Sequence, residues 1–249
     1  MSKYTSDSLG NRMKEYESIT KNFVMKRTPT IIRLDGKAFH TYVKHINPAN
    51  DPSVVSQPFS HNLHYIMTNV VLHLAEEIQN VKIGYTQSDE ITLLLTDWEE
   101  LTTQQWFNGN IQKMTSVSAA IASVWFNKYW VEVFGQNKKL ATFDSRVFNI
   151  PKEEVCNNFI WRQQDASRNS VQMLGHYHFS QKQMHGLNNS QVQDLLMLNK
   201  GINWNDVETW KKRGSCIIKQ DNGKWIVDDN IPIFTQDRNY INQYVFGEE

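Results

Sequence analysis

Two aspartates at the ends of β-type runs are the residues of this chain best placed to do chemistry. Asp35 closes a run that begins at Thr28, and Asp89 lies in the polar turn between the runs Val81 to Tyr85 and Glu90 to Leu95. Two unpaired carboxylates side by side repel each other unless a cation lies between them. Oxygen ligands favour Mg²⁺, and two such ions can drive an in-line attack on a nucleotide phosphate. We therefore predict that Asp35 and Asp89 hold two magnesium ions.

Each aspartate also has a purely structural interpretation. Asp35-Gly36 is a common turn pair, and Ser88-Asp89-Glu90 has the composition of an ordinary hairpin tip. A functional interpretation depends on whether the fold brings the two carboxylates together. If it does, the carbonyl group of Gly36 is a further candidate metal ligand, because glycine has no side chain to block close approach.

Basic residues near the aspartates in the sequence are candidate phosphate ligands. Lys37 and His40 follow the first aspartate directly, Lys113 begins a predicted long helix, and Arg146 lies on a predicted strand. The run Lys211-Lys212-Arg213 is denser, and it can hold an RNA backbone or a triphosphate. All of these residues are also compatible with ordinary solvated surface charge.

Composition excludes several other classes of protein. The chain has 249 residues, and its 26 Lys and Arg balance 26 Asp and Glu, although a neutral total can hide a local basic patch. Its two cysteines, Cys156 and Cys216, are too few for a disulfide framework and indicate a reducing compartment. The N-terminus lacks the apolar run of a signal peptide, and no stretch approaches the ~20 apolar residues of a membrane span. We expect a cytoplasmic protein with no membrane partner.

The order of the predicted elements explains how the two aspartates can meet. That order, after an initial helix, is strand, helix, strand, strand, helix, strand, which is the ferredoxin-like (split βαβ) arrangement of an α+β fold. Its sheet order is 4-1-3-2 with antiparallel neighbours, so Asp35 and Asp89 fall at the same end of the sheet. The predicted ranges are a helix over 7–21, a strand over 28–34, a loop over 44–58, a helix over 59–79, strands over 81–85 and 90–95, a helix over 111–134 and a strand over 142–150.

The chain after Pro151 is predicted to form a second part. It begins with a helix that continues to about Phe179, and it contains an Asn-Gly hairpin signal at Asp221-Asn222-Gly223. We therefore divide the chain into a catalytic domain with an N-terminal helix, residues 1–150, and a helical and β-hairpin part packed on it, residues 151–249. The two hairpin strands are predicted over 215–219 and 224–227.

Several segments resemble the tRNA(His) guanylyltransferase family, and they keep the family's order along the chain. Ile32 to His40 resembles its first motif, and Gly84 to Glu90 resembles its second metal motif. Phe143 to Val147 and Trp161 to Ala166 are similar to the next two blocks, and Arg213-Gly214-Ser215 is similar to a late basic-Gly-Thr/Ser step. Together these similarities make the resemblance specific.

The resemblance implies a polymerase-type palm that runs in reverse. Enzymes of this family activate the 5′ monophosphate of a tRNA with ATP or GTP, and the 3′-hydroxyl of an incoming nucleoside triphosphate then attacks it. Asp35 and Asp89 would carry two Mg²⁺ ions, with the carbonyl of Gly36 on one of them, and the family usually forms a homotetramer. The residues implied to line the activating nucleotide are Lys37, Ala38, Phe39, His40 and Ser88, those implied to hold triphosphate are Lys113 and Arg146, and the candidate RNA contacts are Lys211, Lys212 and Arg213.

Two segments depart from the family pattern. Where the eukaryotic guanylyltransferases carry His-Ile-Asn-Asn, this chain has Ser167-Arg168-Asn169-Ser170, and the family's basic-Pro-x-Asp step is altered at Asn47 to Asp51. The first departure fits the guanylyltransferase-like branch, which repairs truncated tRNA 5′ ends with the opposite strand as template. We therefore predict a template-dependent 3′–5′ nucleotidyltransferase, with addition of an extra 5′ G to tRNA(His) as the alternative.

Two other classes of protein use a similar sheet. A nucleotide cyclase shares the palm and the two aspartates but needs no tRNA surface, so the part after Pro151 with its basic run argues against it. A non-catalytic RNA-binding module would carry paired aromatic residues on its central strands. The corresponding runs here, Ile31 to Leu34 and Ile91 to Leu94, contain none.

Overall fold

A six-stranded sheet forms the centre of the protein, and all of its neighbouring strands are antiparallel. The structure is a computed structural model that describes residues 8–43, 58–135 and 139–247. The spatial order of strands is β4-β1-β3-β2-β5-β6, so the first four strands have the predicted order and the C-terminal hairpin extends the same sheet beyond β2. The strands are β1 (Thr30–Gly36), β2 (Val81–Gln87), β3 (Glu90–Leu95), β4 (Phe143–Asn149), β5 (Ser215–Lys219) and β6 (Trp225–Asp228).

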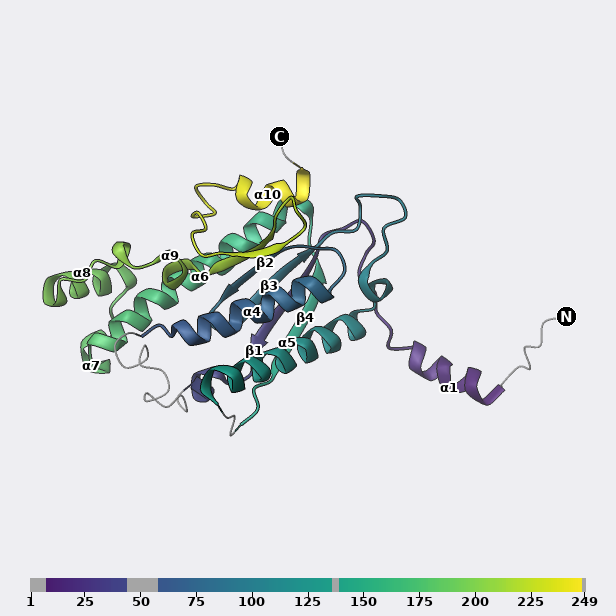
Figure 1. Cartoon of the computed structure of the whole chain (residues 1–249), viewed down its shortest axis with the longest axis horizontal. Coiled ribbons are helices and arrows are strands. Elements are labelled where there is room, and N and C mark those ends of the chain that lie inside the picture. Colours follow the sequence, from purple (N-terminus) through teal and green to yellow (C-terminus); the bar gives the residue numbers. More distant parts are fainter. Residues whose placement is uncertain (1–7, 44–57, 136–138, 248–249) are drawn as a thin grey trace.

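Helices cover both faces of the sheet (Figure 1). α4 (His61–Glu77) and α5 (Ile111–Phe134) pack on one face, and α6 (Lys152–His178) and α10 (Asn239–Phe246) pack on the other. None of the described helices is long and apolar enough to cross a membrane. The remaining helical elements are α1 (Ser8–Ser18), which projects from the body, α2 (Phe39–Tyr42), η2 (Trp106–Gly109), α7 (Gln181–Met184), α8 (Asn189–Lys200), η3 (Trp204–Asp206) and α9 (Thr209–Arg213).

The ends of the predicted elements differ from the observed ones by a few residues. β1 pairs with β3 as far as Asp35 and with β4 as far as Gly36, so Asp35 lies inside the strand rather than after it. β2 likewise continues to Gln87, which leaves Ser88 and Asp89 as a tight turn before β3. α10 was not predicted, and the predicted loop over 44–58 lies, except for its last residue, outside the described residues.

The alternation of side chains along β1 decides which face carries the chemistry. Ile32 and Leu34 belong to the core under α4 and α5, and Ile31 belongs to the core under α6. Successive residues of a strand point to opposite faces. Arg33 and Asp35 therefore face α6, at the end of the sheet where β2 turns into β3.

Candidate active site

The structure brings the two predicted aspartates together at one end of the sheet. The backbone N–H of Gly36 donates to the carbonyl oxygen of Asp89 at 3.2 Å, which ties the end of β1 to the turn between β2 and β3. Ser88 adopts a left-handed conformation with φ of 54°, and its Oγ donates to Oδ1 of Asp89 at 3.1 Å. The turn therefore fixes Asp89 beside the end of the strand that carries Asp35.

The electrostatics of Asp89 are those of a carboxylate that lacks a compensating charge. Burial, and after it the nearby charge of Asp35, together raise the pKa of Asp89 to about 6. Both causes penalise the ionised form of Asp89. A divalent cation at this turn would relieve both.

A row of acidic residues crosses three neighbouring strands at the same end of the sheet. Asp35 is paired directly with Asp144 of β4 on one side and with Glu90 of β3 on the other. Directly paired residues of antiparallel strands project to the same face. With Asp89 in the adjoining turn, four carboxylates are thus gathered at this end.

Arginines neutralise two of these carboxylates. Nη2 of Arg146 lies 3.2 Å from Oδ1 of Asp144, and Nε of Arg162 lies 2.8 Å from Oε1 of Glu90. Within the described ranges, the other two carboxylates of the group form no ion pair with any side chain. The pair left without a positive charge is the pair that the sequence predicts to bind metal.

This donor set fits a cation that is bound jointly by the protein and a phosphate-bearing ligand. In the part of the chain that the structure describes, no three His, Cys, Asp or Glu side chains converge as a metal-binding cluster. Mg²⁺ commonly takes only one or two carboxylates together with waters and substrate phosphates. At Gly36 an added Cβ would lie 2.2 Å from the ring of Phe39, so the backbone here has no room for a larger residue.

The residues after Gly36 are placed in different environments. Lys37 and Ala38 are exposed, and Ala38 has a left-handed φ of 56° at the start of α2. The ring of Phe39 is buried, with its centroid 5.0 Å from that of Phe126, so its side chain belongs to the core and only its backbone remains available to a ligand. His40 lies in α2, but its side chain is outside the described part of the structure.

Of the two predicted triphosphate ligands, only Arg146 lies close to the acidic row. Arg146 lies on the face that carries the acidic row, because its partner in β1 is Arg33. Lys113 lies in the first turn of α5, and its neighbour Met114 lines a small cavity together with Thr30, the first residue of β1. The structure therefore does not bring Lys113 to the aspartate pair within one chain.

The basic run in α9 is not a solvated stripe. Nζ of Lys211 lies 2.6 Å from Oε2 of Glu208, and only 8% of the lysine side chain is exposed. Lys212 is buried, and its Nζ donates to the backbone carbonyl of Asn205. Burial lowers the pKa of Arg213, whose side chain lines a different cavity from that of Lys211. The three cations therefore point to different surroundings.

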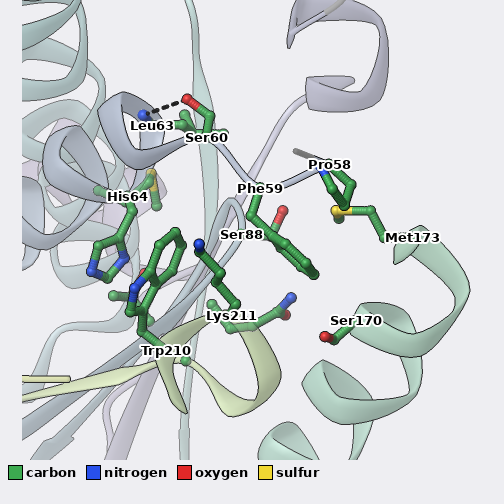
Figure 2. Close-up of a pocket in the computed structure, with 14 residues that line it drawn as sticks. Pro58, Phe59, Ser60, Leu63, His64, Ser88, Ser170, Met173, Trp210 and Lys211 are labelled. Atoms are coloured by element: carbon green, nitrogen blue, oxygen red, sulfur yellow. Dashed lines mark hydrogen bonds between the residues drawn. The ribbon is translucent and has the colours of Figure 1, made fainter. Parts of the chain in front are cut away.

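A pocket that is open to solvent on one side lies beside the aspartate turn, between α4, α6 and α9 (Figure 2). Ser88 reaches it from the turn, Phe59 and Met173 supply apolar walls, and Lys211 supplies a cation. Sequence reasoning missed Phe59 and Met173, because the wall is assembled from segments far apart in the chain and no spacing marks them. Its apolar walls and single lysine suit a ligand with a flat apolar part and an anionic part.

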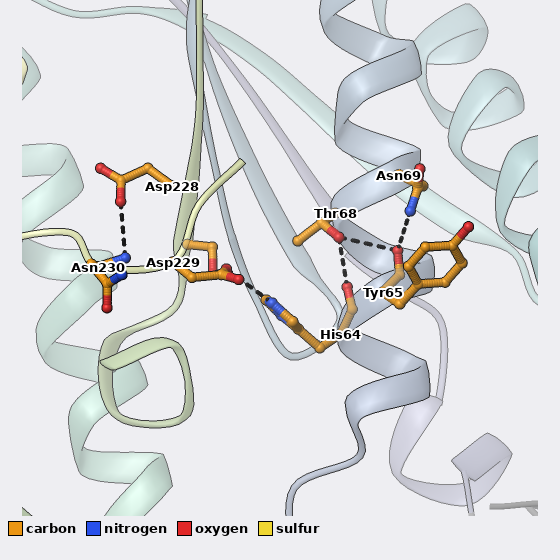
Figure 3. Close-up of polar contacts among 8 residues, drawn as sticks. His64, Tyr65, Thr68, Asn69, Asp228, Asp229 and Asn230 are labelled. Carbon is orange, nitrogen blue, oxygen red and sulfur yellow. Dashed lines mark hydrogen bonds and ion pairs between the residues drawn. The ribbon is translucent and has the colours of Figure 1, made fainter. Parts of the chain in front are cut away.

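An imidazole fastens the α9 side of this cavity to α4. The ring of His64 stacks on that of Trp210 with a centroid distance of 4.2 Å. Nε2 of His64 lies 3.0 Å from Oδ1 of Asp229 (Figure 3), and the same oxygen accepts a hydrogen bond from Oγ of Ser215 at 2.6 Å. Three segments of the chain are thus joined through one side chain, which the sequence did not predict.

Comparison with known proteins gives consistent similarities. The profile of the family described as tRNAHis guanylyltransferase matches residues 10–151. A bacterial tRNA(HIS) guanylyltransferase-like protein solved in complex with ATP is 44% identical, with 96% of this chain and 100% of that chain covered and a TM-score of 0.89. One solved in complex with GTP is 42% identical, with the same coverage and a TM-score of 0.81. The tRNA(His) guanylyltransferase of Debaryomyces hansenii is 24% identical over 225 residues, which are 84% of this chain and 79% of that protein.

Proposed function

We propose that this chain adds nucleotides to tRNA 5′ ends in the 3′–5′ direction and that a template strand selects them. The premise is that the chain belongs to the tRNA(His) guanylyltransferase family. Family membership makes the chain a guanylyltransferase-like nucleotidyltransferase. It also argues against the non-catalytic RNA-binding module. The proposal adds the direction of synthesis, the template and the residues that do the work.

The single observation that carries the proposal is the pair of carboxylates without a positive partner. We propose that Asp35 and Asp89 hold two Mg²⁺ ions, with the carbonyl of Gly36 as a further ligand. When bound, such ions neutralise phosphate charge and polarise the attacking and leaving oxygens. The protein orients the pair through the short turn at Ser88, and the buried position of Asp89 strengthens its interaction with a cation.

The nucleotides are assigned by similarity and by the placement of the surrounding residues. Because the two bacterial relatives were solved with ATP and with GTP, we propose ATP or GTP as the activating nucleotide and nucleoside triphosphates as substrates. We propose that Lys37, the backbone from Ala38 to His40, and Ser88 line the activating nucleotide, and that Arg146 contacts its phosphates. Since Lys113 lies at the far end of the sheet, its proposed contact with triphosphate requires a second copy of the chain in a homotetramer.

The position of Ser167 to Ser170, the run that departs from the family pattern, supports template-dependent repair. Ser167 and Arg168 line a second pocket that is also lined by Arg213, and Ser170 lines the pocket of Figure 2. The run therefore connects two cavities, one of them beside the aspartate turn. We propose that the tRNA acceptor end lies along this face of α6 and α9, with its phosphates near Arg168, Lys211 and Arg213. The buried Lys212 would support this surface indirectly, because its Nζ donates to the carbonyl oxygen of Asn205 beside α9.

The fold supports a polymerase-type palm as the catalytic unit. We propose that residues 1–150 form this palm and that residues 151–249 are packed on it and supply the tRNA-facing surface. The second candidate function, addition of an extra 5′ G to tRNA(His), is favoured by the description of the matching family itself. It does not require the incoming nucleotide to follow the opposing base.

The test is a set of tRNAs that lack the first 5′ nucleotide and carry A, C, G or U at the opposing position. Each is incubated with the protein, Mg²⁺, ATP and all four nucleoside triphosphates. The added nucleotide should follow the opposing base in every case, since a correct pair aligns the 3′-hydroxyl with the activated phosphate. Addition of G to full-length tRNA(His) alone, irrespective of the opposing base, would replace this proposal with the second candidate. The Asp35→Ala and Asp89→Ala variants should be inactive yet folded.

A further inference from the structure

We propose that Arg162 is a positioning residue that holds Glu90 away from the cations and so keeps the site to two carboxylates. This inference rests on the proposed function, because it assumes that Asp35 and Asp89 bind the metal ions. It concerns a residue of α6 that touches neither of these aspartates in any contact described above. Its role is exerted through Glu90.

Glu90 is placed where it would otherwise become a third metal ligand. It follows Asp89 directly in the chain and is the cross-strand partner of Asp35 on the same face of the sheet. Its side chain is 21% exposed, and its Oε1 lies 2.8 Å from Nε of Arg162. A partly buried carboxylate in this position would turn toward a neighbouring bound cation unless another positive group held it.

The structure shows how firmly Arg162 is held. Its side chain is 8% exposed, and Nε lies 2.8 Å from Oε1 of Glu90 while Nη2 lies 2.6 Å from Oδ2 of Asp165. The guanidinium also lies 4.0 Å from the centre of the Trp161 ring. Asp165 is in turn bound by Arg168, with Nη2 at 2.8 Å from its other oxygen. A rigid planar fork with two carboxylates and a ring around it cannot follow Glu90 toward the aspartate turn.

Holding Glu90 away from the aspartate pair limits the negative charge at the site and leaves coordination positions of the metal ions free. A third carboxylate would occupy a position that Mg²⁺ ordinarily gives to water or phosphate. It would also add a negative charge next to the triphosphate. Arg162 therefore leaves enough positive potential at the bound ions for a nucleotide, which is the reason we assign it a role in substrate binding rather than in folding alone.

The experiment measures two binding constants on the full chain, neither of which requires turnover. Mn²⁺ binding is followed by electron paramagnetic resonance, and binding of ATP in the presence of Mg²⁺ is followed by calorimetry. In Arg162→Ala, released Glu90 joins the aspartate pair, so Mn²⁺ should bind at least as tightly as to the parent. ATP with Mg²⁺ should bind about tenfold more weakly, because one added charge within several ångströms has an effect of this order.

The decisive comparison is the double variant Arg162→Ala with Glu90→Gln, in which ATP binding should return to near the parent value. A general loss of structure cannot produce tighter Mn²⁺ binding or be repaired at Glu90. If Arg162→Ala does not fold, Arg162→Lys with and without Glu90→Gln makes the same comparison, since lysine keeps the charge but lacks the fork. The matched control is Arg238→Ala, which removes an arginine that donates to Oδ1 of Asn157 on the same helix at 2.8 Å. It leaves the Arg162–Glu90 pair and Asp165 in place and should leave both constants unchanged.

Two results would overturn the inference. One is parent-like binding of ATP to the Arg162 variants, and the other is a weakened ATP affinity that Glu90→Gln fails to restore. The proposed function fails in a different way, since Asp35→Ala and Asp89→Ala would then bind Mn²⁺ as the parent does. The two failures are thus distinguishable in the same assays.

Discussion

The buried position of Asp89 predicts an unusual dependence of stability on pH in the metal-free protein. The pKa of this carboxyl is raised from 3.8 to about 6, first by burial and then by the charge of Asp35. The folded state therefore binds the proton more tightly than the unfolded state. Stability from this group is greatest below pH 4 and is lost as the pH rises through 6. A shift of about two pKa units corresponds to about 3 kcal/mol.

The replacement Asp89→Asn removes the ionisable group and therefore removes the loss of stability that its ionisation causes. In the presence of a chelator, urea unfolding should show the variant to be more stable than the parent by up to about 3 kcal/mol at pH 8, and by about half as much at pH 5. Addition of Mg²⁺ should reverse the order, because the cation binds the folded parent and not the variant. A difference between variant and parent that stays constant from pH 5 to pH 8 would refute the reasoning.

Glu99 provides a control of opposite sign. Burial disfavours its ionised form, but hydrogen bonds from Lys82 and Thr96 outweigh burial and lower its pKa. Its contribution to stability is present above the unfolded pKa and is lost as the pH falls. Glu99→Gln should therefore destabilise the protein at pH 8 and have little effect at low pH, which would show that the gain at Asp89 is specific to an uncompensated carboxylate.

Three further predictions concern residues near the site. Phe39→Ala should lower the free energy of unfolding in urea by about 3–5 kcal/mol, because its ring is buried among other aromatic rings. Gly214→Ala should lower the melting temperature measured by circular dichroism, since Gly214 has φ of 78° and its Cβ would lie 2.4 Å from the carbonyl oxygen of Thr86. Lys212→Ala should lower the melting temperature but have little effect on the affinity for tRNA, because its Nζ is bound to a backbone carbonyl. Arg213→Ala should weaken tRNA binding in titrations and reduce the salt dependence of that binding by about one counterion.

The arrangement of the first four strands could be predicted because local patterns determine it. Alternating apolar residues define a buried face for each strand, and the long helices between them force the crossover connections. The hairpin from Val81 to Leu95 then places Asp89 at the end of β2, and the strand order places Asp35 beside it. Convergence of these two residues follows from topology alone, so it needed no knowledge of side-chain conformation.

The surroundings of the candidate ligands could not be predicted in the same way. Phe39 lies within the first motif, but its ring, which follows the left-handed turn at Ala38, points into the core rather than toward a ligand. Lys212 is adjacent to two other cations in sequence, yet its partner is a backbone carbonyl seven residues earlier. Proximity along the chain does not report which way a side chain points. The ligand roles assigned to these positions remain predictions.

The charge balance at the end of the sheet connects the two parts of the chain. Asp144 is neutralised by an arginine of its own strand, but Glu90 is neutralised by Arg162, which comes from α6 in the C-terminal part. Without α6, three partly buried carboxylates would compete for the same cations and would repel a triphosphate. The helix that presents residues 167–170 toward the proposed tRNA surface is therefore the same helix that keeps the site to two carboxylates. A division of the chain at residue 150 separates elements of the sheet, but the chemistry that we propose requires both sides of it.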